Sequence, residues 1–288
     1  MQNNIQWFPG HMTKTRRLIE ENLKMIDVVV EILDSRIPYS GRNPYFDDII
    51  KNKPRLLVMN KSDLSDKART TAWINWYAKN GISVIPISCT TGAGINKITQ
   101  SARELIQDKL DRDKEKGRTR TLKIMMVGIP NVGKSSLINR LVGKASTKTG
   151  DRPGVTKGKQ WIRLKGDVEL LDTPGILAPK FEDQELAKRL AYTGAIKDEI
   201  MNTELLAYSL CEYLAKNYTE LLISRYKLDT VDGLEGYEIL EKIGKKRGFV
   251  ISGGEIDMER AANMVLDEFR GAKIGQITLE TPEDIIEE

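Results

Sequence analysis

The sequence predicts an α/β domain with a mainly parallel sheet, followed by a small all-α domain. Short β-branched runs alternate with helical stretches over the first two-thirds of the 288 residues, which is typical of parallel α/β sheets. Strand signals nearly vanish beyond residue 182. Residues 1–181 hold 32 basic and 18 acidic side chains (net +14), whereas residues 182–288 hold 13 and 23 (net −10). We therefore expect one domain over 1–181 and a helical domain over 182–288.

Six strands are expected in the first domain, each with β-branched or leucine-rich content. They cover residues 28–33, 55–59, 83–87, 122–127, 161–164 and 168–171. Helices are expected between them, including one helix over 95–116 that is followed by an exposed connector at 117–120. In the second domain, Ala261, Val265 and Phe269 lie at helical spacing. Asp257 is the expected N-cap of that helix, and Gly271 is the expected residue after it, where glycine accepts positive φ.

Composition excludes several classes of protein. Apolar runs such as residues 124–127 are far shorter than the roughly 18 to 20 residues that cross a bilayer. The N-terminus lacks a basic and apolar signal segment, and two cysteines are too few for a disulfide framework. We expect a cytoplasmic protein without a membrane partner. The charge asymmetry suits either a polyanion partner on the basic side or a solvated charged surface.

A phosphate-binding loop follows the strand expected at 122–127. The run Gly128-Ile-Pro-Asn-Val-Gly-Lys-Ser135 meets the GxxxxGK[ST] pattern and opens a helix. Glycines let backbone N–H groups wrap phosphates, Lys134 reaches the β- and γ-phosphates and assists catalysis, and the Ser135 hydroxyl can ligate Mg²⁺. The expected nucleotide contacts here are Asn131, Val132, Gly133, Lys134, Ser135 and Ser136.

A second motif, Asp172-Thr-Pro-Gly175, comes directly after the strand expected at 168–171. This places the Asp172 carboxylate at a strand tip, where it can hold a water bound to Mg²⁺. The backbone N–H of Gly175 can then meet the γ-phosphate. The tetrapeptide alone fits an ordinary turn, and the phosphate-binding loop some 40 residues earlier is what makes it a nucleotide motif.

The run Asn60-Lys-Ser-Asp63 indicates a guanine base. The Asp63 carboxylate can accept from N1–H and from the exocyclic amine of guanine, a donor pair that adenine lacks. Asn60 can brace the neighbouring loops, and the Lys61 stem can cover the base. Backbone N–H groups around Ser88 and Cys89 can donate to guanine O6. GTP and GDP are therefore the expected ligands.

The motifs occur in an unusual order, because the base-reading run precedes the phosphate-binding loop. Loops at the carboxyl ends of parallel strands build one site whatever their order in the chain, so a circularly permuted GTPase domain is expected. The chain resembles the circularly permuted GTPases of ribosome assembly. The resemblance spans nearly the whole chain and rests on Trp7-Phe-Pro-Gly-His-Met12, on this motif order and on Gly253-Gly254-Glu255-Ile256-Asp257.

The resemblance implies a function in assembly of the large ribosomal subunit, with GTP hydrolysis stimulated by the particle. It implies binding of the subunit precursor and its RNA. It also implies that the second domain, despite its net negative charge, contacts ribosomal RNA. We expect binding in the GTP state during late assembly, and a monomer away from the ribosome. Asn131 resembles the residue that in potassium-activated GTPases ligates K⁺ beside the phosphates, although an asparagine merely suited to the turn explains this residue as well. Thr156 is the expected second Mg²⁺ ligand.

Hydrolysis should depend on an unusual group. Many GTPases place a glutamine directly after the glycine of the Asp-x-x-Gly motif, and here that position is Ile176, which cannot orient water. The single histidine, His11, can accept a proton from water near neutral pH, and the resemblance implies a catalytic role for it. A packing or RNA-contact role for His11 fits the sequence equally well.

A basic segment surrounds Thr156. It contains one acid, Asp151, and can meet RNA phosphates in the GTP state or remain a solvated loop. Its seven basic residues are Lys144, Lys148, Arg152, Lys157, Lys159, Arg163 and Lys165.

Two alternatives belong to other classes of function. In the first, an RNA-binding module uses nucleotide only to regulate binding, and hydrolysis is incidental; loss of Lys134, Asp63 or Asp172 would signal a degraded nucleotide site, and all three are present. The second alternative is a membrane-traffic or signalling switch. It would require a lipidation motif, and the C-terminal residues contain none.

Overall fold

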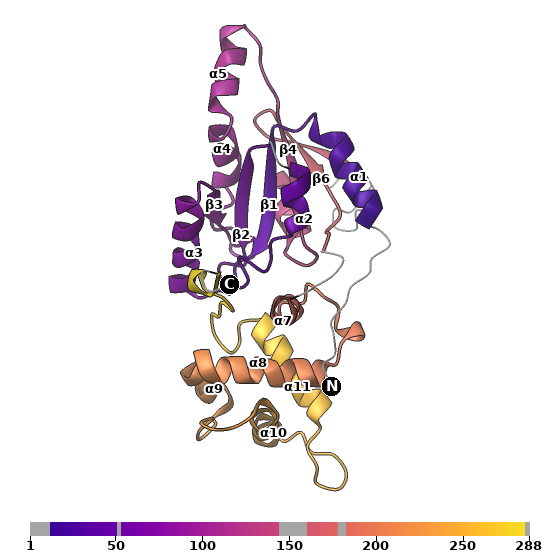
Figure 1. Cartoon of the computed structure of the whole chain (residues 1–288), viewed down its shortest axis with the longest axis vertical. Coiled ribbons are helices and arrows are strands. Elements are labelled where there is room, and N and C mark those ends of the chain that lie inside the picture. Colours follow the sequence, from indigo (N-terminus) through magenta and orange to yellow (C-terminus); the bar gives the residue numbers. More distant parts are fainter. Residues whose placement is uncertain (1–11, 51–52, 144–159, 178–182, 286–288) are drawn as a thin grey trace. The chain divides into compact units, whose positions relative to one another are not determined.

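The computed structural model describes residues 12–50, 53–143, 160–177 and 183–285 (Figure 1). Residues 183–277 form one compact unit, and the other unit combines the preceding residues with those from Thr278 onward. From the sequence, the helical domain is expected to extend to residue 288. The structure differs at this end, because hydrogen bonds such as that from Leu279 N to Arg36 O (2.8 Å) tie the C-terminal segment to the first unit.

The first unit is built on a six-stranded sheet in the order β3-β2-β1-β4-β6-β5. Among the strands of the described residues, only β5 runs antiparallel to its neighbour, β6, so the prediction of a mainly parallel sheet is confirmed. Every strand ends within one residue of its expected bounds. The strands are β1 (Val28–Asp34), β2 (Arg55–Asn60), β3 (Ser83–Pro86), β4 (Leu122–Gly128), β5 (Gln160–Leu164) and β6 (Val168–Asp172).

Helices connect these strands, as parallel pairing requires. The prediction of one continuous helix over 95–116 is wrong, because Ile106 leaves the helical conformation (φ −124°, ψ 21°) and turns its side chain into the protein. Helix α1 (Met12–Leu23) precedes β1. The helices between strands are α2 (Pro44–Ile50), α3 (Lys67–Lys79), α4 (Lys97–Glu104), α5 (Gln107–Glu115) and α6 (Lys134–Val142), and the short η3 (Pro282–Ile285) follows residue 277.

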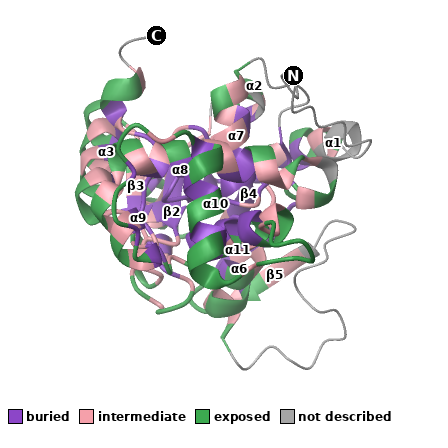
Figure 2. Cartoon of the chain, turned by 90° about the horizontal axis from the view of Figure 1, so that it is seen from below, coloured by how far each residue is buried: buried purple, intermediate pink, exposed green. Residues whose placement is uncertain are grey.

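The sheet forms the core of this unit. All seven residues of β1 are buried, as expected for a central parallel strand with both faces covered. Val29 packs with Phe46 and Met125 in one cluster, and Leu33 packs with Trp73 in another. Fully burying such side chains stabilises a fold by about 1.5–3 kcal/mol each. Figure 2 shows the buried strands in purple and the exposed sides of helices such as α3 in green.

The second unit is helical, as predicted. Its central helix α8 contacts the four other α-helices in the part of this unit that the structure describes. Gly236 permits a close approach, because a Cβ at this position would lie 2.1 Å from the carbonyl oxygen of Tyr208. The helices are α7 (Gln184–Tyr192), α8 (Thr203–Asn217), α9 (Thr219–Tyr226), α10 (Gly236–Arg247) and α11 (Met258–Arg270), with a short 3-10 turn, η2 (Asp198–Ile200).

The two predicted caps of α11 have different outcomes. Asp257 is confirmed as the N-cap, since its carboxylate accepts from the backbone N–H of Arg260 at 3.0 Å. The prediction of positive φ at Gly271 is wrong. Gly271 has φ −87°, and the left-handed position falls one residue later, on Ala272 (φ 52°). The chain therefore reverses after Gly271 rather than at it.

Candidate nucleotide-binding site

The phosphate-binding loop joins β4 to α6 at the carboxyl edge of the sheet. Gly133 has φ 93° and directly precedes Lys134, the first residue of α6. A Cβ on Gly133 would lie 2.3 Å from Asn60 Nδ2, so only glycine fits here. Asn131 also has positive φ (60°), a conformation that asparagine tolerates. The loop ends at a helix N-terminus, where exposed N–H groups favour an anion.

Lys134 and Asp172 meet at the centre of this site. Met126 of β4 is the register partner of Asp172 at the end of β6, which brings the second motif beside the phosphate-binding loop. Lys134 Nζ lies 3.0 Å from Asp172 Oδ1, and both side chains are buried. The expectation that these two motifs form one site is therefore consistent with the geometry.

The donor set fits a magnesium ion. Ser135 presents a half-buried hydroxyl in the first turn of α6, and Asp172 presents a buried carboxylate at the end of a neighbouring strand. Hydroxyl and carboxylate oxygens, completed by phosphate oxygens and water, are the ligands that Mg²⁺ takes in nucleotide sites.

Gly175 and Ile176 pack directly on the phosphate-binding loop. A Cβ on Gly175 would lie 3.0 Å from Pro130 N, and the backbone N–H of Ile176 donates to Gly128 O at 3.2 Å. The Ile176 side chain is buried in the core cluster that contains Val29 and Leu171. This position therefore anchors the loop after β6 and presents no polar group to water.

Asn60 joins three loops around the base-reading run. Its Nδ2 donates to Val132 O at 2.7 Å, and its Oδ1 accepts from Cys89 N at 3.0 Å. These are the bracing contacts expected of Asn60. The backbone N–H of Ser88 donates to Ala93 O at 3.0 Å. The Ser88 and Cys89 N–H groups, expected to face guanine O6, thus donate within the protein in this structure.

The base-reading lysine is held by a residue that the sequence analysis missed. Lys61 Nζ lies 2.9 Å from Asn131 O and 2.9 Å from Asp34 Oδ2. Arg36 grips the same carboxylate through Nε (2.9 Å) and Nη2 (2.8 Å). Burial alone raises the pKa of Asp34, but the Arg36 and Lys61 charges outweigh it and hold that pKa well below its usual range. The available signal was the position of Asp34 at a buried strand's end, like Asn60 and Asp172.

Some predicted site residues lie outside the described part of the chain. They are His11, Thr156 and most of the basic segment, including Lys157 and Lys159. Of that segment, Arg163 and Lys165 are described, and both are exposed. Asp63 is partly buried, Ser136 is exposed, and Gly175 is exposed beside the phosphate-binding loop.

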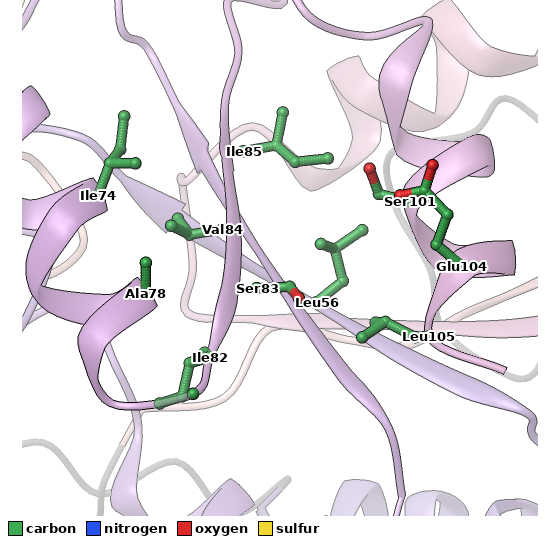
Figure 3. Close-up of a pocket in the computed structure, with 11 residues that line it drawn as sticks. Leu56, Ile74, Ala78, Ile82, Ser83, Val84, Ile85, Ser101, Glu104 and Leu105 are labelled. Atoms are coloured by element: carbon green, nitrogen blue, oxygen red, sulfur yellow. The ribbon is translucent and has the colours of Figure 1, made fainter. Parts of the chain in front are cut away.

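A separate groove of about 640 Å³ lies beside the edge strand β3 (Figure 3). Ile74 of α3, Val84 of β3 and Leu105 after α4 form its apolar walls, and Glu104 is its one charged lining residue. An acidic, apolar groove disfavours phosphate, and it shares no residue with the nucleotide motifs. The strand at this edge is short and ends in Pro86, which lacks an N–H, so pairing with another strand is discouraged.

Comparisons with known proteins agree with this geometry. The family described as 50S ribosome-binding GTPase matches residues 123–223. A protein of Bacillus licheniformis named ribosome biogenesis GTPase A is 48% identical over 282 residues, covering 98% of this chain and 99% of that protein. The chain belongs to the ribosome biogenesis GTPase A family. It is a GTP hydrolase with a P-loop GTPase domain, as predicted.

Two further relatives extend the family. The mitochondrial ribosome-associated GTPase 1 of Mus musculus is 35% identical, and the alignment covers 96% of this chain and 90% of that protein. A solved GDP-bound structure of YlqF is similar with a TM-score of 0.69 at 27% identity, covering 93% of this chain and all of that chain. Among the helices of the described residues, none is long and apolar enough to cross a membrane.

Proposed function

We propose that this GTPase acts in late assembly of the large ribosomal subunit, binds the subunit precursor in its GTP state and hydrolyses GTP on the particle. The observation that carries the proposal is the Lys134–Asp172 contact. It joins the phosphate-binding loop to the Asp172–Gly175 motif, which in GTPases contacts the γ-phosphate and its Mg²⁺. The names of the relatives support the ribosomal partner, since they are ribosome biogenesis and ribosome-associated GTPases.

Guanine recognition is assigned to Asp63, whose carboxylate accepts from N1–H and the exocyclic amine. Lys61 covers the base, and Asn60 keeps this run fixed against the phosphate-binding loop through Val132 O. An adenine base would leave the acceptor unpaired, which costs about 1–3 kcal/mol. The residues around Ser88 and Cys89 complete the base pocket.

Phosphate binding is assigned to residues 131–136, with the Lys134 ammonium placed against the β- and γ-phosphates. Ser135, Thr156 and Asp172 are the proposed residues for Mg²⁺, which when bound neutralises developing phosphate charge. The N–H of Gly175 serves the γ-phosphate. A K⁺ ligand role for Asn131 stays a prediction, and the turn explains the residue equally. Hydrolysis rates that differ between KCl and NaCl at equal ionic strength are its test.

Water positioning is assigned to His11. The burial of Ile176 supports this assignment, because no polar side chain occupies the position where many GTPases hold a glutamine. His11 is the single histidine of the chain. We expect slow GTP turnover by the protein alone and faster turnover on the ribosomal particle.

The test of the proposed function is cosedimentation with ribosomal particles in a GTP analogue and in GDP. The proposal predicts sedimentation with large subunits or their precursors in the analogue and release in GDP. Lys134→Ala, which removes the phosphate-binding ammonium, should abolish the difference between the nucleotides. Equal sedimentation of the parental protein in both nucleotides would favour the alternative of an RNA-binding module with incidental hydrolysis.

A further inference from the structure

The three residues Thr278–Glu280, named here the C-terminal strap, are fully or almost fully buried in the first unit. Leu279 N donates to Arg36 O at 2.8 Å, in the loop that follows β1. Thr278 Oγ1 accepts from Asp66 N at 3.1 Å, and Thr278 O accepts from Arg69 Nη1 at 2.7 Å. Asp66 is the N-cap of α3, so the strap joins the loop after β1 to the helix that follows the base-reading run.

Glu280 fixes the same loop through a buried carboxylate. Ser40 donates to it from the backbone N–H (3.0 Å to Oε1) and from its hydroxyl (2.5 Å to Oε2). The backbone N–H of Tyr39 also donates to Oε1. On the other side, Trp73 Nε1 of α3 donates to the Glu280 carbonyl at 3.0 Å. Loss of the charged acceptor would leave buried N–H groups short of a partner, which is costly.

The anchored loop leads directly to the base-reading lysine. The carbonyl of Arg36 accepts from the strap, and its guanidinium grips Asp34 with two hydrogen bonds. The Asp34 carboxylate in turn holds the Lys61 ammonium at 2.9 Å, and Lys61 reaches Asn131 of the phosphate-binding loop. Asp34 and Arg36 are both almost fully buried, so this arrangement does not depend on solvent.

We propose that Thr278 and Glu280 are positioning residues for guanine recognition. The strap holds the loop after β1 and the start of α3, and through Arg36 and Asp34 it keeps Lys61 in place beside Asp63. Both strap side chains bind groups of the loop after β1 or of the start of α3, so the role proposed for them is indirect. Binding sites lose affinity when such supporting groups loosen by a fraction of an ångström. The inference rests on the assignment of Asn60–Asp63 to the base under the proposed function.

The test compares Glu280→Gln with the matched control Glu283→Gln, which alters an exposed glutamate three residues further on. Affinities for GDP and for inosine diphosphate, which lacks the exocyclic amine, are measured by competition against a fluorescent guanine nucleotide. Glu280→Gln should weaken GDP binding about tenfold and inosine diphosphate binding less, so that the ratio between them shrinks. The control should match the parent in both affinities. A parental GDP affinity, or an equal loss for both nucleotides, would overturn the inference.

A second variant covers the case in which Glu280→Gln does not fold. Thr278→Val keeps the side-chain volume and removes the hydroxyl that serves Asp66, and it should reduce the same ratio about threefold. An unchanged ratio in this folded variant counts against the strap.

Asp63→Asn, measured with xanthosine diphosphate, separates the two hypotheses. No gain toward xanthosine would overturn the base-reading assignment itself. A clear gain, together with a parental ratio of GDP to inosine diphosphate affinity in Glu280→Gln and Thr278→Val, would overturn the strap inference alone.

Discussion

Lys134 Nζ and Asp172 Oδ1 lie 3.0 Å apart, which places the phosphate-binding ammonium against the carboxylate at the tip of β6. The contact orients Lys134 toward the site. It also means that each charge stabilises the other, because both groups are almost removed from water.

The first prediction concerns this pair. Lys134→Met should lower the free energy of unfolding of the nucleotide-free protein by about 3 kcal/mol, because a buried carboxylate loses its ammonium partner. The double variant Lys134→Met with Asp172→Asn should recover most of that loss. Urea unfolding in EDTA measures both. Lys188→Met, in an exposed pair with Glu185, is the control and should cost at most about 1 kcal/mol. Equal losses in Lys134→Met and in the control would contradict the prediction.

The second prediction addresses the basic segment. Changing Lys157 and Lys159 to glutamate should weaken binding to large ribosomal subunits and leave GTP affinity nearly unchanged, because these lysines are expected to meet RNA phosphates. The slope of log affinity against log salt should fall by about one for each lysine. Cosedimentation across a salt series measures it. Glutamates at Lys114 and Lys116, exposed at and just after the end of α5, form the control. Identical salt series for both double variants would remove Lys157 and Lys159 from the interface.

The third prediction concerns His11. A positioning group or general base contributes about 10²–10⁴-fold to a rate, so His11→Ala should reduce particle-stimulated GTP turnover within that range. GTP affinity should hardly change, since the nucleotide contacts come from other loops. Phosphate release with and without large subunits, beside a nucleotide titration, measures the two effects. Turnover at the parental rate on the particle would return His11 to a packing or RNA-contact role.

The fourth prediction uses pH. Glu31 is buried in β1, with Oε2 3.4 Å from Arg55 Nη1, and burial raises its pKa against the opposing effect of Arg55. The folded protein therefore holds this proton more tightly than the unfolded chain, and stability falls as pH rises from the ordinary value of about 4.3 through the raised one. Glu31→Gln should stabilise the protein at pH 8 by about 1–3 kcal/mol and less at pH 5.

Arg55 retains Asp47 as a second partner in that variant, so it keeps an ion pair. Thermal unfolding at the two pH values measures the gain. Glu169→Gln, on the half-exposed side of β6, is the control and should show little difference between pH 5 and pH 8. A gain for Glu31→Gln that does not grow with pH would show that its charge is not the cause.

The strands were predictable because their hydrophobic runs have both faces covered, and the motif residues follow them at the carboxyl edge. Asn60, Lys134 and Asp172 could be placed for this reason. Ile106 could not be recognised as a helix end, since its deviation depends on tertiary burial and not on a glycine or proline. Asp34 and Arg36 belong to no motif considered from the sequence. Their role could not be predicted, because it depends on the contact of Asp34 at the end of β1 with Lys61 directly after the neighbouring strand β2.

The strap was hidden for a different reason. Thr278 and Glu280 lie more than 200 residues from the groups they contact, and polar residues that follow the last expected helix suggest an exposed segment. Only the folded chain shows Glu280 surrounded by donors from residues 39 and 40. Local pattern and composition carry no information about such a long-range contact.

The position of the strap has a consequence for synthesis of the protein. Translation makes β1, β2 and β3 before the phosphate-binding loop, and the strap only after residues 183–277. Ser40 and Tyr39 in the loop after β1 therefore lack the Glu280 carboxylate until residues 278–280 have been made. Residues 183–277 are made during this interval, and they amount to an insertion into the unit that the strap completes. A nascent chain that stops before residue 278 would contain every nucleotide motif and still lack the segment that completes this unit.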